Sequence, residues 1–87
     1  MSADSMSSRV TLFLAAVGEQ ILTYRETAGL SVEQLAEKTG MAADDLDRVE
    51  HGWIDIDLGR LQTIADALGV TAAELLDVSG SELGLSF

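Results

Sequence analysis

Carboxylate side chains gather in one short stretch of this 87-residue chain. Between residues 42 and 57 there are six acidic residues and one base, Arg48. Five of the acids are the aspartates Asp44, Asp45, Asp47, Asp55 and Asp57. Clustered carboxylates can bind a divalent cation, but a calcium loop also needs a central glycine and a terminal glutamate, and this spacing has neither. We therefore expect no metal site.

Two further residues, His51 and Ser31, have side chains that take part in nucleophilic catalysis elsewhere. His51 comes at the end of a predicted helix, and Ser31 stands where a serine caps the start of another. No nucleophile and base with a supporting third group emerge from the spacing, and no cofactor motif is present. The chain has one histidine and no cysteine, which leaves no set of zinc or disulfide residues. We predict a protein that is not an enzyme and needs no cofactor.

Length and charge narrow the function further. A chain of this length forms one small domain. Five basic and fifteen acidic residues give a net charge of −10, which opposes the attraction to phosphates on which most nucleic-acid affinity depends. The polar start lacks the basic region of a signal peptide, and no apolar run approaches the roughly 18 residues of a membrane span. We expect a cytoplasmic protein without membrane contact.

The spacing of apolar residues predicts an all-α domain over residues 9–77. Apolar side chains recur at three- and four-residue steps from Arg9 to Ala28, which indicates one long first helix. Four shorter helices are predicted at about residues 32–39, 43–51, 58–68 and 72–77. We expect a disordered tail over residues 1–8. The alternating Leu83, Leu85 and Phe87 favour an extended C-terminal tail over residues 78–87.

Capping signals separate these helices. Ser31 is followed by Gln34 and Thr71 by Glu74, the spacing of a capping box at the start of a helix. Gly40 ends the second helix after only two turns, and the third follows at once. Two short helices joined by one glycine-containing turn are typical of a helix-turn-helix.

A longer ordered set of residues resembles the Cro/cI (XRE) family of helix-turn-helix regulators. The set consists of Ile21, Arg25, Gly29–Ser31, Leu35, Ala36, Gly40, Glu50, Gly52, Leu61 and Ile64–Val70. It covers about residues 18–76, and each position answers a different packing or turn requirement. The resemblance implies a five-helix, lambda-repressor-like DNA-binding domain, here with an extended first helix and a short C-terminal tail.

The resemblance also implies roles for individual residues. Arg25 near the end of the first helix is expected to form a structural salt bridge with Glu50 at the end of the third. The third helix is implied to be the recognition helix of a transcriptional regulator that binds duplex DNA. The implied DNA-contacting positions are Val32, Ala42, Ala43, Asp44, Asp47 and Arg48.

The residues at these positions leave two functions open. An ionised aspartate only accepts hydrogen bonds and repels phosphates, and Val32 has no polar group for the DNA backbone. Arg48 alone is well suited to a base. The first hypothesis is DNA binding with an unusually acidic recognition surface. The alternative is a protein-interaction module that uses its acidic face to bind a basic partner.

Apolar residues outside the expected core raise the question of what covers them. They are Val10, Phe13, Leu14, Val17, Trp53, Ile54, Leu83, Leu85 and Phe87. One solution is a homodimer in which these residues form the interface. The other is intramolecular, with the tail and the loop at residues 53–56 capping the ends of the helical core.

Overall fold

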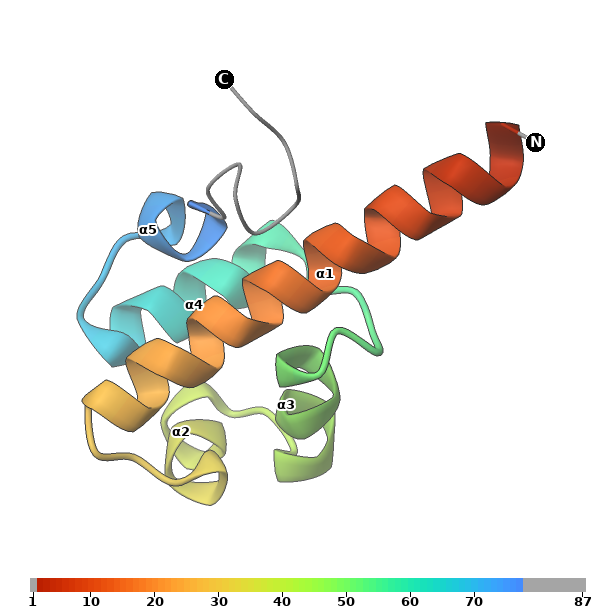
Figure 1. The fold of residues 1–87 in the computed structure, drawn as a ribbon. Coiled ribbons are helices and arrows are strands. Elements are labelled where there is room, and N and C mark those ends of the chain that lie inside the picture. Colours follow the sequence, from red (N-terminus) through yellow and green to blue (C-terminus); the bar gives the residue numbers. More distant parts are fainter. Residues whose placement is uncertain (1, 78–87) are drawn as a thin grey trace.

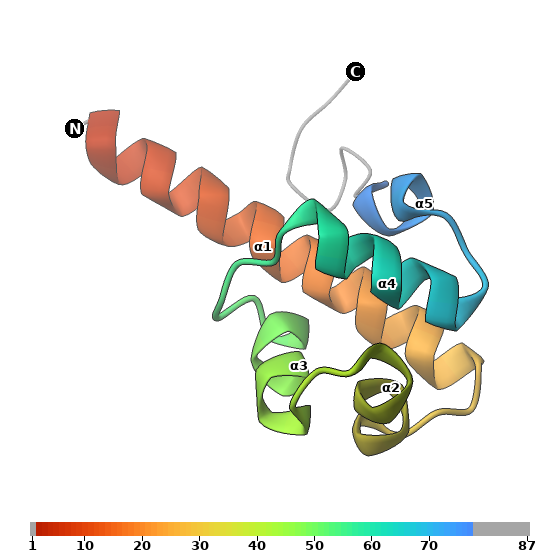
Figure 2. The same ribbon diagram turned by 180° about the vertical axis from the view of Figure 1, so that it is seen from behind.

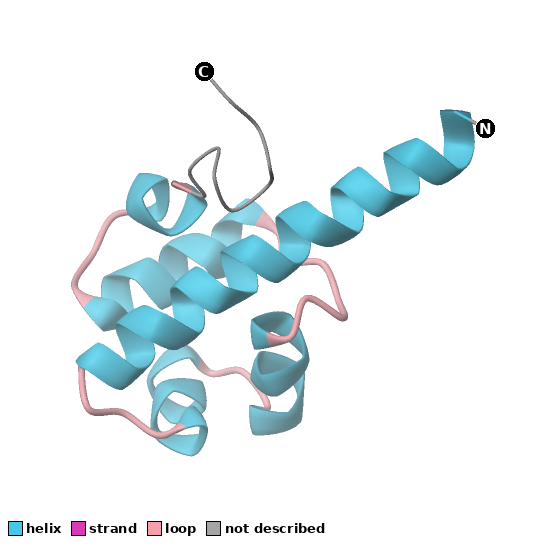
Figure 3. Ribbon diagram, in the orientation of Figure 1, coloured by secondary structure: helices cyan, strands magenta, loops and turns pink. Residues whose placement is uncertain are grey.

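Five helices make up the part of the chain that the structure describes. The computed structural model describes the backbone of residues 2–77 and the side chains of residues 12–77. The helices are α1 (Ser2–Thr27), α2 (Val32–Thr39), α3 (Ala43–Glu50), α4 (Leu58–Leu68) and α5 (Ala72–Leu76) (Figure 1). Over residues 2–77 there are helices and loops and no strand (Figure 3). The predicted all-α fold with five helices is confirmed.

Three of the short helices, α2, α4 and α5, begin at a residue whose side chain caps them. The Ser31 hydroxyl accepts the Gln34 backbone N–H at 3.0 Å, and the Gln34 side chain accepts the Ser31 backbone N–H at 2.8 Å. Thr71 and Glu74 form the same reciprocal pair at the start of α5. Such caps stabilise a helix by about 1 kcal/mol each because they satisfy backbone donors that have no partner within the helix. The start of α2 is therefore determined locally, by Ser31 and Gln34.

One apolar core joins all five helices. Its fully buried side chains are Ile21, Leu35, Leu46, Leu61, Ile64 and Leu75. Every helix contributes at least one of them, and α1 runs across the other four (Figure 2). Because α3 is only eight residues long and would not be stable alone, this shared core holds it in place.

Close backbone packing fixes the end of α3 against α1. A Cβ atom added at Gly18 would fall 2.5 Å from the carbonyl oxygen of Glu50 and closer still to that of Val49. Only glycine allows the two backbones to approach so closely. The C-terminal end of α3 therefore has a defined position on α1.

The first helix differs from the sequence prediction at its start. It begins at Ser2 and not at Arg9, and so includes residues 2–8 of the segment that was expected to form a disordered tail over residues 1–8. No glycine or proline interrupts residues 2–17, and extending an existing helix costs far less than starting one. The predicted tail over residues 78–87 lies outside the described residues.

Two apolar residues, Val17 and Leu58, differ sharply in their burial. Val17 is 3 % exposed and belongs to the core of its own chain, which removes it from the expected dimer interface. Its neighbour in the core is Ile21, one turn along α1, so the stripe that packs intramolecularly begins earlier than expected. Leu58, the first residue of α4, is apolar and 73 % exposed.

Over residues 2–77 no helix combines the length and the apolar composition required to cross a membrane. The same part of the chain holds no group of three acidic or histidine side chains arranged to bind a metal ion.

Candidate nucleic-acid interface

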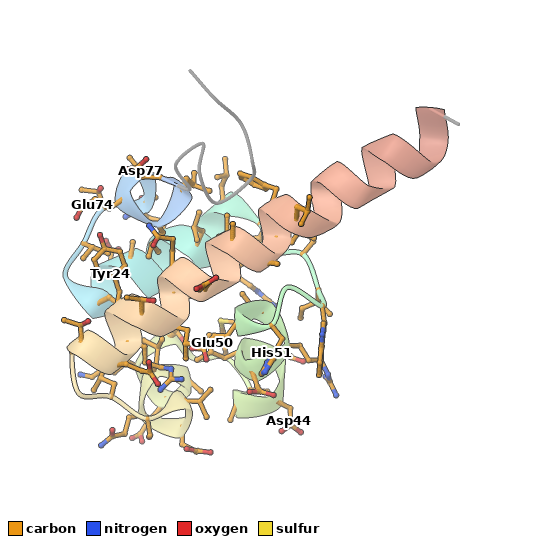
Figure 4. The ribbon with its side chains drawn as sticks, in the orientation of Figure 1. Tyr24, Asp44, Glu50, His51, Glu74 and Asp77 are labelled. Carbon is orange, nitrogen blue, oxygen red and sulfur yellow. The ribbon has the colours of Figure 1, made fainter. Side chains whose placement is uncertain are left out.

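The second and third helices form a helix-turn-helix whose outer side is α3. Leu46, Val49 and Glu50 are the buried side chains of α3. Asp44, Asp47, Arg48 and the following His51 are exposed. In Figure 4, Glu50 lies between α3 and α1, whereas Asp44 lies at the outer end of α3. The helix thus presents a polar face to solvent from a fixed position.

An ion pair at the inner end of α3 secures that position. The Arg25 guanidinium donates two hydrogen bonds to the Glu50 carboxylate, from Nε at 2.6 Å and from Nη2 at 3.0 Å. Its Nη1 donates a third, at 2.9 Å, to the carbonyl of Leu30. The two charged side chains are 12 % and 3 % exposed. Arg25 therefore ties the end of α1, the loop before α2 and the end of α3 together.

The electrostatics of this pair follow from its burial. The hydrogen bond that Arg25 donates to Glu50 raises the pKa of the guanidinium, against the opposing effect of desolvation. The guanidinium is therefore charged at neutral pH, and it lies against the Glu50 carboxylate that accepts two of its hydrogen bonds. The pair has a structural role and lies away from the exposed face of α3.

The exposed face of α3 contains two local polar contacts, one between Arg48 and Asp45 and one between His51 and Asp47. Arg48 Nη1 lies 3.2 Å from Asp45 Oδ1, and both side chains are about half exposed. His51 Nδ1 lies 2.8 Å from the backbone oxygen of Asp47 and 3.6 Å from its carboxylate oxygen Oδ1. Exposed pairs of this kind contribute little to stability, so these side chains can rearrange when a partner approaches.

The six positions implied to contact DNA do not all lie on this face. The structure brings Asp44, Asp47 and Arg48 together on its exposed side. Ala43 and Val32 are half-buried and pack against the core, so their side chains have little exposed surface for a ligand to contact. Ala42 is exposed at the N-terminal cap of α3, where no side chain caps the helix. The backbone N–H groups of the first turn of α3 therefore lack a side-chain acceptor.

An aromatic pair at the end of α3 was not foreseen from the sequence. The rings of His51 and Trp53 stack with centroids 4.8 Å apart at an interplanar angle of 28°, and Trp53 is 70 % exposed. The sequence offered a signal only for the contact of His51 with Asp47, because residues four apart on one helix lie on the same face. The stack itself depends on the loop after α3, whose course the spacing does not define.

The remaining residues expected at a dimer interface differ in their exposure to solvent. Phe13 is 39 % exposed and Leu14 is half-buried, whereas Ile54 packs against the core of its own chain. The side chain of Val10 and the three tail residues, Leu83, Leu85 and Phe87, lie outside the described residues.

Comparisons with known proteins agree with this architecture. Residues 16–78 match a family described as "Helix-turn-helix domain". The restriction-modification controller protein C.AhdI from Aeromonas hydrophila is 31 % identical, with a TM-score of 0.70, and the match covers 71 % of this chain and 94 % of that one. The clp gene regulator ClgR from C. glutamicum is 22 % identical with a TM-score of 0.77, over 82 % and 91 % of the two chains. Among curated protein sequences none matches this chain.

The family match covers most of the chain and includes all of α2 and α3. The identity to C.AhdI extends over nearly the whole of that protein, and the likeness to ClgR is one of fold. These findings agree with the helix-turn-helix of α2 and α3, the buried Arg25–Glu50 bridge and the shared core. The chain belongs to the helix-turn-helix family and is a transcriptional regulator of the Cro/cI type.

Proposed function

We propose that this regulator binds duplex DNA as a homodimer, with the exposed face of α3 in the major groove. The observation that carries the proposal is the fixed, outward position of α3, which the Arg25–Glu50 pair and the Gly18 contact maintain. A major groove about 12 Å wide admits one α-helix. C.AhdI is by name a controller protein, and we infer a comparable role in controlling genes for this chain.

Arg48 is the residue that we assign to base recognition. Its side chain is 51 % exposed and, among the described residues, bonds only to Asp45, one turn away on the helix. A guanidinium can donate two hydrogen bonds to the O6 and N7 atoms of guanine, which discriminates against other bases by about 1–3 kcal/mol. Breaking the exposed Asp45 contact costs less than that. Arg48 can therefore give up its contact with Asp45 and bind a guanine instead.

The aspartates beside Arg48 limit what the helix can bind. Asp44 and Asp47 can accept a hydrogen bond from the amino group of cytosine but repel the phosphates on either side. We therefore expect recognition of G·C pairs and a low affinity for DNA of arbitrary sequence. Contacts to phosphates come from backbone N–H groups, at the start of α2 beside Val32 and at the uncapped start of α3. The protein acts by binding and not by catalysis.

Selection from a random pool of duplexes tests this function. We expect the wild-type protein to enrich a G·C-containing sequence at low salt and to release it as salt rises. Arg48→Ala should lose the preference, whereas Lys38→Ala, which removes the same charge from α2, should keep it. If the wild-type protein enriches no sequence at low salt, the function is wrong.

A second function is favoured by the charge of the same surface. Asp44, Asp45 and Asp47 lie on α3, and Asp55 and Asp57 follow in the next loop. Such a face matches a basic protein partner, for example the DNA-binding surface of another regulator. Replacing the three α3 aspartates with lysine should then abolish binding of every captured partner. The control replaces the exposed Glu19, Glu26 and Glu37 with lysine, and equal binding by both variants rejects this function.

A further inference from the structure

The N-terminal half of α1 extends past the other four helices (Figures 1 and 2). A helix of 26 residues is about 39 Å long, close to the 41 Å longest dimension of the fold. Among its described side chains the first buried ones are Ala16 and Val17. About half of α1 therefore lies beyond the core. A helical segment of that length is marginally stable in water unless another element packs on it.

The sequence of this half has the pattern of a helix that packs along another helix. Ala3, Met6, Val10, Phe13 and Val17 follow one another at alternating steps of three and four residues. This is the spacing of the apolar positions in a coiled coil. Val17 enters the core of its own chain, and the same helical face continues outward through the other four positions. The extending half thus has an apolar face in register with the core.

More apolar surface lies where α1 leaves the body of the domain. Phe13, Trp53 and Leu58 are 39 %, 70 % and 73 % exposed, and we call these three residues the root cluster. A Cβ atom added at Gly52 would fall 2.6 Å from Cα of Ala15, which places the loop bearing Trp53 directly against α1. The start of α4, where Leu58 stands, lies beside the same part of α1 (Figure 1).

Charge makes a second copy of this chain the best match for these surfaces. Residues 2–13 contain one acid, Asp4, and one base, Arg9, so this segment is neutral. The rest of the chain carries the whole net charge of −10. Two copies repel each other through most of their surfaces but not through this segment. An acidic or strongly basic partner would have no complementary charge here.

We propose that two copies pair through the extending halves of α1, antiparallel and related by a twofold axis. The apolar face of each helix lies on that of the other, and the tip of each reaches the root cluster of its partner. A parallel pair would bring the two acidic domains side by side. The antiparallel pair places the acidic domains at opposite ends. This interface specifies the homodimer of the proposed function.

The molar mass in solution without DNA tests the interface, so a failure here is distinguishable from a failure to bind DNA. At tens of micromolar we expect a dimer of twice 9.2 kDa. Val10→Asp places a charge on the apolar face and should raise the dimer dissociation constant about 100-fold or more. Ser8→Asp adds the same charge on the opposite face of the helix and should leave the dimer intact. Leu58→Asp places a charge in the root cluster, which the tip of the partner's α1 reaches in the proposed dimer, and should also weaken the dimer.

Engineered cysteines test the direction of the pair, because the natural chain has none. An antiparallel pair predicts that a Met6→Cys chain mixed with a Val10→Cys chain forms a mixed disulfide dimer in preference to either self-linked dimer. Preferred self-linked dimers would contradict the antiparallel arrangement. A monomeric wild-type protein, as expected if residues 78–87 cover the root cluster within one chain, or a Val10→Asp dimer as strong as the Ser8→Asp dimer, would overturn the proposal.

Discussion

Arg25 and Glu50 stand 25 residues apart and are joined by two hydrogen bonds of 2.6 and 3.0 Å. The guanidinium comes from α1 and the carboxylate from the end of α3, so the pair connects the longest helix to the exposed recognition helix. It is almost completely removed from water. The position of α3 therefore depends on a buried contact at its C-terminal end.

Removing one partner of this pair should destabilise the fold strongly. Arg25→Ala leaves the Glu50 carboxylate buried without compensation, and we expect a loss of about 3–5 kcal/mol in the free energy of unfolding. Replacing both residues with methionine should cost much less, because neither charge then remains buried. Urea denaturation followed by circular dichroism measures both. A loss below about 1 kcal/mol for Arg25→Ala would show that the pair does not hold α3.

The stabilisation by Arg25 should not depend on pH near neutrality or in moderate alkali. Because Glu50 raises the pKa of the folded guanidinium, its contribution is complete below the unfolded pKa and is lost only as pH rises through the folded pKa. Both values lie far above neutral pH. The difference in unfolding free energy between wild type and Arg25→Ala should stay constant between about pH 7 and 10. A steady decline of that difference across the range would contradict this assignment.

Close packing at Gly18 should make even one methyl group harmful. Gly18→Ala forces the α1 and α3 backbones apart, since the new Cβ meets carbonyl oxygens of the end of α3, and should cost about 1–3 kcal/mol or more. Gly59→Ala is the matched control in another helix, where the added Cβ meets only the side-chain oxygen of Asp57, at 3.3 Å. We expect it to change stability by less than about 1 kcal/mol. Equal effects in thermal denaturation would refute the close approach.

Neutralising the outer aspartates of α3 should strengthen binding to DNA. Asp44→Asn with Asp47→Asn removes two negative charges that face the phosphates, and each should raise the affinity for arbitrary duplexes about threefold at low salt. The control is Glu19→Gln with Glu26→Gln, which removes equal charge from exposed sites on α1. Fluorescence anisotropy of a labelled duplex measures both. If the two double variants gain equally, net charge and not the α3 face determines the affinity.

Local signals in the sequence were sufficient for much of this fold. The Ser31–Gln34 and Thr71–Glu74 caps act over three residues, so the starts of α2 and α5 could be predicted to the residue. The Arg25–Glu50 bridge spans 25 residues and came only from the family resemblance.

Features that depend on tertiary neighbours were less predictable. The burial of Val17 and the exposure of Leu58 depend on where α4 meets α1. The spacing of apolar residues within either helix does not specify that contact. The His51–Trp53 stack depends on the path of the loop after α3. Of the six implied DNA positions, periodicity alone did not show that Ala43 and Val32 face the core.

The most direct test of the central claim is a map of the DNA-contacting residues in solution. In a two-dimensional ¹⁵N–¹H NMR titration of this 9.2 kDa chain with its selected duplex, each backbone amide reports separately. We predict that the largest shifts occur in residues 42–53 and at the start of α2, with the Arg48 side chain among them. Large shifts confined to α4 and α5, with α3 unchanged, would contradict DNA binding through this helix.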